Sequence, residues 1–526
     1  MSPSTQDLPD LYEAGITELQ AGLDAGLFTS VDLVNAYLSR IEEVNLQGPE
    51  LRAVLEISPI ALDVAAKLDE ERRVSGRRTM MHGIPVLLKD NIATEHSEGL
   101  NTTAGSHALF KSVVPDDAGV VKRLRQAGAI ILGKTNMSEF AFFRGKIPSG
   151  WSGRGGQCKS AYHPNGSPSG SSSGSGVAAS VGLATVTIGT ETDGSIASPS
   201  SSNNVVGVKP TVGLTSRAGV LPITAAQDTV GPMTRSVEDA AIVLSIIAGE
   251  DPNDRRTLSQ PRPVPDYPKA LDINTLHGKR IGVPRSSIPS GPENDNALPQ
   301  SMLTTFNESL RIIESLGATI LDPANLPSAE QINTLDHLVL YVDFKIELNE
   351  YLAALKEVPT GVRTLADVIR FNEDHPDLEL PEGYSDQSEL VRSEATEGRD
   401  EAYGRALARN AELGATRGID SVLEEYRLDA LVVPAKGTHT PAAIAGYPTV
   451  TVPLGFFPED EPIKYDGTNV AYPAPGMPFG LTFVGTAFDE YALIGMAYAF
   501  EQATKVRTSR KAIEGAVPKM QLESKS

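Results

Sequence analysis

Cysteine is almost missing from this chain, because Cys158 is the only one among its 526 residues. A single thiol cannot form an internal disulfide, and it cannot build a metal site made of several thiolates. The first seven residues also lack the basic flank and the apolar run of a secretory signal. We therefore expect a soluble protein of the cytoplasm, which is a reducing compartment.

Positive charge is also scarce. The chain has 46 lysines and arginines against 67 aspartates and glutamates, which gives a net charge of −21. This excess of negative charge opposes binding to nucleic-acid phosphates and to anionic membrane surfaces. No apolar run approaches the roughly 20 residues that span a bilayer. We expect neither nucleic acid nor membrane as a partner.

Histidine is sparse and scattered, with eight residues in all. No two of them have the i, i+4 spacing of a helical zinc site, so we expect most histidines to be surface or packing residues. Paired carboxylates do not point to a site either, since 67 acidic residues supply many chance pairs. We predict no metal site and no other cofactor.

The apolar residues change their spacing along the chain. Residues 8–78 have the period of helices, with Ser30 as an expected helix cap. Between 80 and 250, short β-branched runs alternate with helical patterns, which is typical of an α/β sheet with helices on its faces. A helix-rich, acidic excursion follows at 329–426. Strands are expected at 86–88, 129–132, 185–188, 205–208, 280–283, 318–321, 430–433, 449–452 and 481–484, and helices at 118–126, 237–248, 302–316 and 491–504.

Two motif matches point to other classes of protein. Residues 128–135, Gly-Ala-Ile-Ile-Leu-Gly-Lys-Thr, fit the phosphate-binding loop formula letter for letter. Their variable positions are apolar and strand-like, however, whereas a phosphate cradle needs a mobile loop. Residues 170–174 fit the nucleophile-elbow formula with Ser172 at the centre, but turn formers precede them instead of a strand. We expect a buried strand at the first match and no elbow at the second.

A glycine- and serine-rich run at 167–176 is the most informative segment. Taken alone, such a run is typical of a linker, and Lys89 and Ser195 have equally simple interpretations as a surface lysine and a turn residue. The run leads, however, into the small-residue segment 177–184 and then into a strand, so we expect it to enter a helix inside the core. That helix and the tight turn at 192–195 would both present unpaired amides, as an oxyanion requires.

Together these motifs resemble the amidase signature family. The resemblance rests on the lysine motif at 83–91, the Gly-Ser-Ser-Ser-Gly run, the Asp-Gly-Ser-Ile motif whose serine follows Ser171 by 24 positions, and segment 206–214. It extends from about residue 19 to 504, and its details are most similar to the peptide amidases. The resemblance implies an α/β fold in which helices cover both faces of a large mixed central sheet. It further implies a single amidase domain over 1–526, with the catalytic core at 80–250.

The resemblance also implies three catalytic residues. Ser195 corresponds to the nucleophile, Ser171 to a serine held in a cis conformation that relays protons, and Lys89 to the terminal base. A serine hydroxyl needs a base at neutral pH, and a lysine can serve only when burial and neighbours lower its pKa. This arrangement would need no histidine.

The implied oxyanion hole consists of the backbone amides of Thr192, Asp193, Gly194 and Ser195. The backbone of Ala141 corresponds to a substrate-contacting position. Two residues depart from the family pattern. Ser169 stands where a glycine is usual, and Ala197 stands where most members have an arginine that would pair with Asp193. We therefore expect the 192–195 turn to be held in this chain by other contacts than in most members of the family.

Three functions remain open on these residues. The first is a free-standing hydrolase that cleaves a carboxylic amide to acid and ammonia or amine, with the C-terminal amide of peptides as the first guess and a monomer or homodimer as the expected state. The second is the same acyl chemistry on carbamates, aryl amides or esters. The third is a component of an assembly that feeds ammonia to charged tRNA, against which the net charge and Ala197 speak. The pocket walls are expected near 142–151, 329–426 and 438–447.

Overall fold

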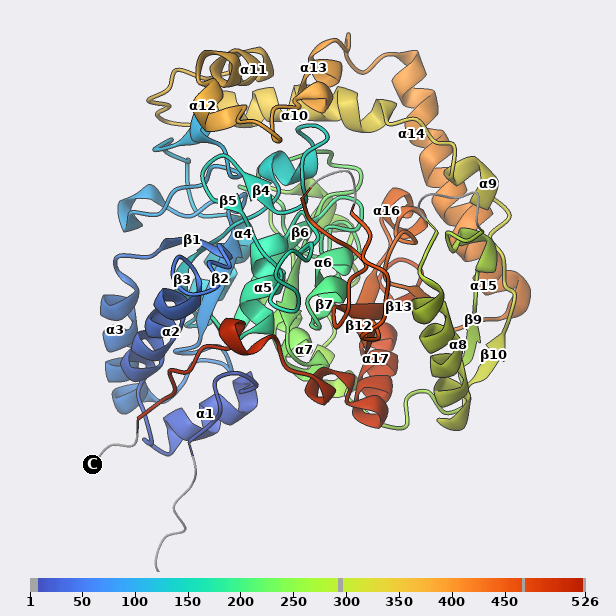
Figure 1. Ribbon diagram of the computed structural model, residues 1–526, viewed down its shortest axis with the longest axis horizontal. Coiled ribbons are helices and arrows are strands. Elements are labelled where there is room, and N and C mark those ends of the chain that lie inside the picture. Colours follow the sequence, from blue (N-terminus) through green and yellow to red (C-terminus); the bar gives the residue numbers. More distant parts are fainter. Residues whose placement is uncertain (1–7, 292–296, 466–468, 524–526) are drawn as a thin grey trace, which may run out of the picture.

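The computed structural model describes residues 8–291, 297–465 and 469–523, and a mixed sheet of 11 strands forms its centre (Figure 1). The strands lie in the order β1-β3-β2-β6-β8-β7-β12-β13-β11-β9-β10. Their bounds are β1 (Val54–Ile57), β2 (Pro85–Lys89), β3 (Ile130–Thr135), β6 (Val186–Glu191), β7 (Val206–Lys209), β8 (Thr229–Thr234), β9 (Arg280–Gly282), β10 (Thr319–Leu321), β11 (Ala430–Pro434), β12 (Thr449–Phe456) and β13 (Pro478–Val484).

Strand direction divides the sheet into three parts. The neighbours β3, β2 and β6 are parallel, and so are β11, β9 and β10 at the other end. The strands between them, β6 through β13 to β11, pair antiparallel, as does β1 at its edge. A separate two-stranded hairpin joins β4 (Trp151–Ser152) to β5 (Gly156–Gln157). The predicted large mixed sheet is confirmed.

Two strands of the central sheet, β1 and β8, are not predicted from the sequence, and neither is the short β4–β5 hairpin. Strand β1 is only four residues long and lies between two helices, so its short apolar run disappears in the helical lead-in. Strand β8 contains Pro232, and a proline counts against an interior strand because it has no N–H to donate. Strand β8 nevertheless pairs with both β6 and β7, with Pro232 opposite Ile188.

Helices cover both faces of this sheet. The first helices, α1 (Ile16–Asp24), α2 (Ser30–Val44) and α3 (Ala61–Ser75), occupy the expected lead-in. The cap of α2 is Thr29 and not Ser30, which is its first helical residue. Thr29 Oγ1 accepts from Asp32 N and the Asp32 carboxylate accepts from Thr29 N, a capping box that Ser30, with its side chain buried, cannot form. The other sheet-covering helices are α4 (Gly119–Gln126), α5 (Ser173–Ser180), α6 (Ala197–Ser202), α7 (Val237–Ile247), α8 (Gln300–Ser315), α16 (Thr440–Ala445) and α17 (Glu490–Thr504).

The segment 329–426 holds helices α9 to α15, with α10 to α13 forming a layer at one end of the molecule, beyond β4 and β5 (Figure 1). That this segment and the sheet form a single domain stays a prediction. Among the described residues, no helix is both long and apolar enough to cross a membrane. The bounds are α9 (Ala329–Ile332), α10 (Leu338–Ala354), α11 (Leu365–Asp374), α12 (Pro376–Glu379), α13 (Ser388–Glu394), α14 (Glu401–Gly414) and α15 (Asp420–Tyr426).

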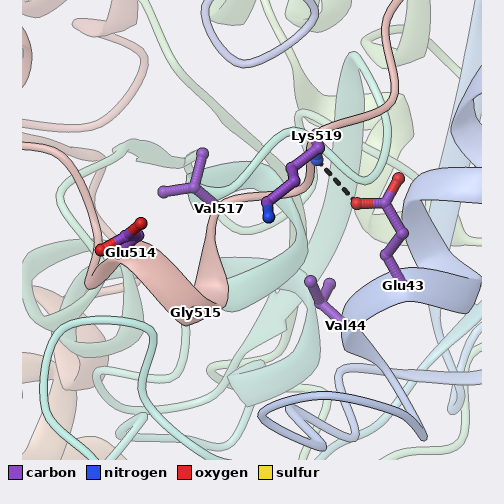
Figure 2. A pocket seen from close by; sticks show the side chains of 6 residues that line it. All are labelled: Glu43, Val44, Glu514, Gly515, Val517 and Lys519. Atoms are coloured by element: carbon purple, nitrogen blue, oxygen red, sulfur yellow. Dashed lines mark hydrogen bonds between the residues drawn. The ribbon is translucent and has the colours of Figure 1, made fainter.

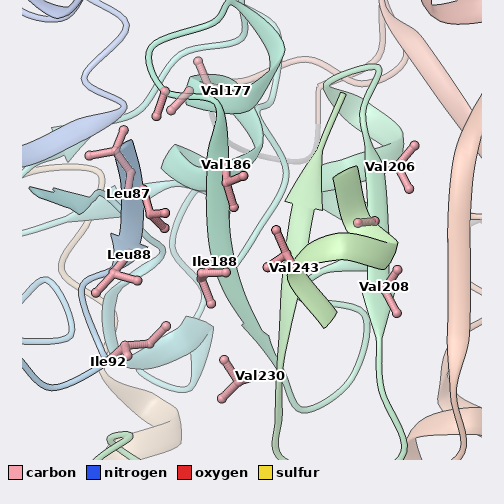
Figure 3. Packing of buried hydrophobic residues seen from close by; sticks show 14 of the residues in the cluster. Leu87, Leu88, Ile92, Val177, Val186, Ile188, Val206, Val208, Val230 and Val243 are labelled. Atoms are coloured by element: carbon pink, nitrogen blue, oxygen red, sulfur yellow. The ribbon is translucent and has the colours of Figure 1, made fainter. Parts of the chain in front are cut away.

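The hydrophobic core includes the part of the sheet formed by β2, β6, β8 and β7 (Figure 3). Side chains of β2, β6, β8 and β7 pack together there, and α5 and α7 add Val177 and Val243. Every residue of β2, β3 and β6 is buried, as is typical of parallel strands that are covered on both faces. Polar side chains at the ends of such strands have little access to water and must find partners within the protein.

Candidate active site

Three chain segments bring the predicted catalytic residues to one edge of the sheet. Lys89 ends β2, and Ser195 follows β6, the parallel neighbour of β2. Ser171 precedes α5, in the serine-rich run, and its peptide bond with Gly170 is cis. The N–H of Ser172 donates to the carbonyl of Ser195 over 3.2 Å, which holds the run against the turn after β6. The carboxyl ends of parallel strands share one edge, so this topology collects the two segments there.

The Lys89 side chain is fully buried and points at hydroxyl groups. Its Nζ lies 2.8 Å from Ser171 Oγ, 2.8 Å from Thr190 Oγ1 and 3.0 Å from the Thr190 carbonyl oxygen. Burial lowers the pKa of this amine to about 7, although the carboxylates of Asp228 and Glu191 oppose that shift. A substantial fraction of Lys89 is therefore neutral near pH 7, and a neutral amine can accept a proton.

Ser172 has a different environment from Ser171. Its Oγ donates to the Thr190 carbonyl over 3.0 Å and accepts from the Thr190 N–H over 3.3 Å. Both contacts tie it to the backbone of β6, and its side chain is fully buried. A hydroxyl held in this way is a structural group, in agreement with the expectation that 170–174 forms no nucleophile elbow.

The turn between β6 and α6 contains the four residues predicted to bind an oxyanion. Gly194 has a φ of +83°, a left-handed conformation that glycine adopts without steric cost. The Glu191 carboxylate accepts from the N–H groups of Ile196 and Ala197, over 2.7 and 2.9 Å, and so caps the helix that follows. Thr192 Oγ1 donates to the buried Asp228 carboxylate over 2.5 Å. Ser195 itself is largely buried, with 9 % of its surface exposed.

The Asp193 side chain is held by the start of α16 (Thr440–Ala445). Its carboxylate receives hydrogen bonds from His439 Nδ1 and from Thr440 Oγ1, the second over 3.0 Å. The scattered histidines predict only a surface or packing role for His439, so the sequence misses this contact. The only signal is Ala197, which lacks the side chain that would otherwise pair with Asp193.

Ala141 lies in a strained stretch beside the same site. It and its neighbours Phe140 and Phe142 have φ values of +55°, +48° and +74°, a conformation that non-glycine residues rarely adopt. Ala141 lines a small cavity with Asn91, Thr190 and Thr192. The structure thus brings Ala141 close to Thr190, a partner of Lys89, and to Thr192 of the turn, and its role toward substrate stays a prediction.

A buried ion cluster joins the Ala141 loop to the helical segment. Arg144, Glu139 and Glu379 are all inaccessible to solvent, and Arg144 Nη1 lies 2.6 Å from Glu139 Oε1 and 3.5 Å from Glu379 Oε2. Burial, reinforced by the nearby Glu139 carboxyl, raises the pKa of Glu379. Trp151 also stacks on Tyr384, with 4.9 Å between ring centroids. The expected walls at 142–151 and 329–426 are therefore in direct contact.

The two remaining motif predictions concern phosphate and metal binding. Lys134, the lysine of the phosphate-loop match, is buried in β3 and donates to the Ile92 carbonyl, so it has no phosphate-binding role in this fold. In 8–291, 297–465 and 469–523, no three His, Cys, Asp or Glu side chains are grouped as metal ligands.

A second pocket lies apart from these residues, between the end of α2 and the C-terminal segment (Figure 2). Its lining comprises Glu43, Val44, Glu514, Gly515, Val517 and Lys519. The Glu43 carboxylate accepts a hydrogen bond from the backbone N–H of Lys519 over 2.7 Å. This bond joins the C-terminal segment to α2. None of the predicted catalytic residues belongs to it.

Comparison with known proteins gives consistent matches over nearly the whole chain. The family model Amidase matches residues 32–494. The crystal structure of the peptide amidase from Stenotrophomonas maltophilia is 43 % identical, with a TM-score of 0.84 over 95 % of this chain and 98 % of that one. A protein of Arabidopsis thaliana named as a probable amidase is 41 % identical over 96 % of this chain and 92 % of its own length. The crystal structure of an amidase family protein from Bacillus anthracis is 32 % identical, with a TM-score of 0.84 over 95 % and 92 % of the two chains.

Proposed function

The chain belongs to the amidase family, and from this premise we propose that it removes the C-terminal amide of peptides through a covalent acyl-enzyme. It is an amidase, an enzyme that hydrolyses amide C–N bonds. The likeness to a peptide amidase over nearly the full length of both chains supports the substrate class. The products are the free peptide acid and ammonia.

The observation that carries this proposal is the contact between Lys89 and Ser171. A fully buried amine with a pKa of about 7 lies 2.8 Å from a serine hydroxyl, and that serine adjoins the turn that contains Ser195. A general base works best when its pKa is near the working pH, and this environment provides that match. A surface lysine, with a pKa near 10.4, would be protonated and useless as a base.

In the proposed reaction, Ser195 Oγ attacks the amide carbonyl carbon and gives its proton to Ser171, whose own proton passes to neutral Lys89. The oxyanion that forms is bound by backbone amides of the 192–195 turn. The proton then returns along the same path to the departing nitrogen, which leaves as ammonia. Water, deprotonated along the same path, then attacks the carbonyl carbon of the acyl-enzyme ester. The bond between that carbon and Ser195 Oγ breaks, the peptide acid leaves, and the proton returns to Ser195 Oγ.

The substrate experiment compares four compound classes under one condition. We expect the purified chain to release ammonia from a peptide amide without tRNA or a partner protein, and to act more slowly on aryl amides, carbamates and esters, as read by mass spectrometry. Preference for another class would correct the substrate. Ammonia release that requires tRNA and a partner would instead identify a component of a transamidating assembly, which the charge of −21 opposes.

The nucleophile has a matched control in the same chain. Ser195→Ala is expected to lower kcat by about 10⁶-fold, as removal of a catalytic serine does elsewhere, while circular dichroism stays unchanged. Ser172→Ala removes the same atom from a hydroxyl that only bonds the β6 backbone, so we expect it to retain activity within about tenfold. Equal losses in both variants would refute the assignment of Ser195.

A further inference from the structure

The Asp193 side chain is anchored from outside its own turn. Its two carboxylate oxygens receive hydrogen bonds from His439 Nδ1 and Thr440 Oγ1, which lie at the start of α16, 246 and 247 residues further along the chain. Ala197, the first residue of α6, has no polar side chain to offer. The conformation of the turn at this point therefore depends on α16.

The same imidazole also covers the next residue, Gly194. A Cβ placed on Gly194 would lie 2.6 Å from Nε2 and 2.7 Å from both Cδ2 and Cε1 of His439. Three ring atoms at nearly equal distance mean that the ring presents its face to the Gly194 Cα. His439 therefore contacts two consecutive residues of the turn, one by a hydrogen bond and one by packing.

His439 is itself held in place by local backbone bonds. Its carbonyl accepts from the N–H of Ala443 over 3.0 Å, which continues into α16. The preceding Thr438 Oγ1 donates to the carbonyl of Pro434, the last residue of β11, over 2.5 Å. The imidazole thus projects from a segment fixed to the central sheet, as a positioning group requires.

Charged groups surround this imidazole from several elements. Asp193 and Glu191 contribute negative charge from the turn and from β6, whereas Lys436 contributes positive charge from the segment after β11. The negative charge of Asp193 also acts electrostatically on Lys209 of β7. Burial disfavours the charged imidazole, but the Asp193 carboxylate outweighs it and raises the pKa of His439 above its ordinary value.

We propose that His439 is a positioning residue for the reaction, which holds the Asp193–Gly194 peptide in the shape that binds the oxyanion and offsets the Asp193 charge beside it. This proposal rests on the proposed function of the turn. An uncompensated carboxylate next to an oxyanion hole opposes the negative charge that develops in the transition state. His439, at the start of α16, therefore supplies the hydrogen bond to Asp193 that the side chain of Ala197 cannot make.

The test compares His439→Gln, His439→Leu and Thr440→Val with the wild type on a peptide amide. We expect kcat to fall by about 10²–10³-fold in His439→Leu and by about 10–100-fold in His439→Gln, which keeps a donor but no charge, while KM stays within about threefold. Thr440→Val should lose less than either, because one donor to Asp193 remains. His337→Gln, on an exposed histidine at the start of α10, is the matched control and should behave as wild type.

The pH profile separates positioning from general destabilisation. In the wild type, kcat is expected to rise as Lys89 loses its proton and to fall as His439, whose pKa lies above its ordinary value, loses its own. His439→Gln should keep the rise and lose the fall, with a thermal midpoint within a few degrees of wild type. An unchanged profile, a loss confined to KM, or a loss explained by unfolding would overturn this role. Activity retained in Ser195→Ala would instead refute the proposed function, whatever His439→Gln does.

Discussion

Two neighbouring strands, β2 and β3, each carry a buried lysine, and the surroundings of Lys89 and Lys134 can be compared directly. Both lysines are fully buried, and they lie on the parallel strands β2 and β3, where Leu88 pairs with Lys134 and Lys89 with Thr135. Burial lowers the pKa of each, to about 7 for Lys89 and about 8 for Lys134, against opposing carboxylates nearby. By burial and pKa alone, the two amines are nearly equivalent.

Their neighbours differ. Lys89 Nζ contacts Ser171 Oγ and so reaches the serine-rich run and the turn after β6. Lys134 Nζ donates to the Ile92 carbonyl and to Thr102 Oγ1, over 2.5 and 3.0 Å, and neither partner leads to a nucleophile. Both buried lysines have a hydroxyl neighbour, and what differs is that only the hydroxyl beside Lys89, that of Ser171, adjoins the turn after β6.

Among the substitutions that test the comparison of the two lysines, removal of Lys89 has the largest expected effect. Lys89→Met keeps most of the packing volume but removes the proposed base, so kcat/KM for a peptide amide should fall by about 10³–10⁴-fold. The fold should survive, because a buried charge that costs desolvation energy is lost with it. Steady-state kinetics and circular dichroism on the same preparation measure both quantities. Activity within tenfold of wild type would exclude Lys89 as the base.

Lys134→Met makes the same chemical change one strand away. We expect kcat/KM within about threefold of wild type and an altered pH dependence of stability instead. Because the folded pKa of about 8 lies below the unfolded one, the unfolded chain binds more protons between about pH 8 and 10.4, so wild-type stability rises with pH in that window. The variant should lack this rise, which is on the order of 3 kcal/mol by urea unfolding. A Lys134→Met variant that folds but is inactive would refute the claim that only Lys89 of the two lysines is needed for activity.

The sequence already separates these two lysines, because their local patterns differ. Lys134 lies within an apolar strand-like run, and that run by itself argues against a phosphate loop at 128–135. Long buried strands and amphipathic helices are predictable for the same reason, since their periodicity is local. The large mixed sheet follows from the family resemblance and is confirmed.

What the sequence conceals is structure that depends on distant residues or on short elements. The pairing of His439 with Asp193 spans 246 positions and has no motif, so Ala197 reveals that a partner is missing without showing which residue replaces it. Strand β8 is hidden by Pro232, whose cost is offset by pairing on both sides. The roles of Lys89 and Ser195 stay predictions, because only a reaction can test them.

The smallest expected effect concerns the hydroxyl beside each lysine. Thr190 Oγ1 accepts from Lys89 Nζ over 2.8 Å and from Asn91 Nδ2 over 3.1 Å. Thr102 Oγ1 accepts from Lys134 Nζ over 3.0 Å and from the Thr94 N–H over 3.3 Å. Each threonine thus bonds one lysine and one further nitrogen, so Thr190→Val and Thr102→Val are a matched pair.

Thr190→Val should move the rising limb of the kcat/KM profile to lower pH by up to about one unit. A hydrogen bond accepted from the charged amine stabilises the ammonium form, so its loss lowers the pKa of Lys89 further below about 7 and leaves the neutral base available in more acidic solution. Thr102→Val changes only Lys134 in the same way, and its profile should coincide with that of wild type. Equal shifts in both variants, or a shift to higher pH in Thr190→Val, would show that the limb reports a group other than Lys89. A shift in Thr190→Val alone would assign the titration to the lysine that adjoins Ser171, because each substitution removes one hydroxyl that accepts from a buried lysine.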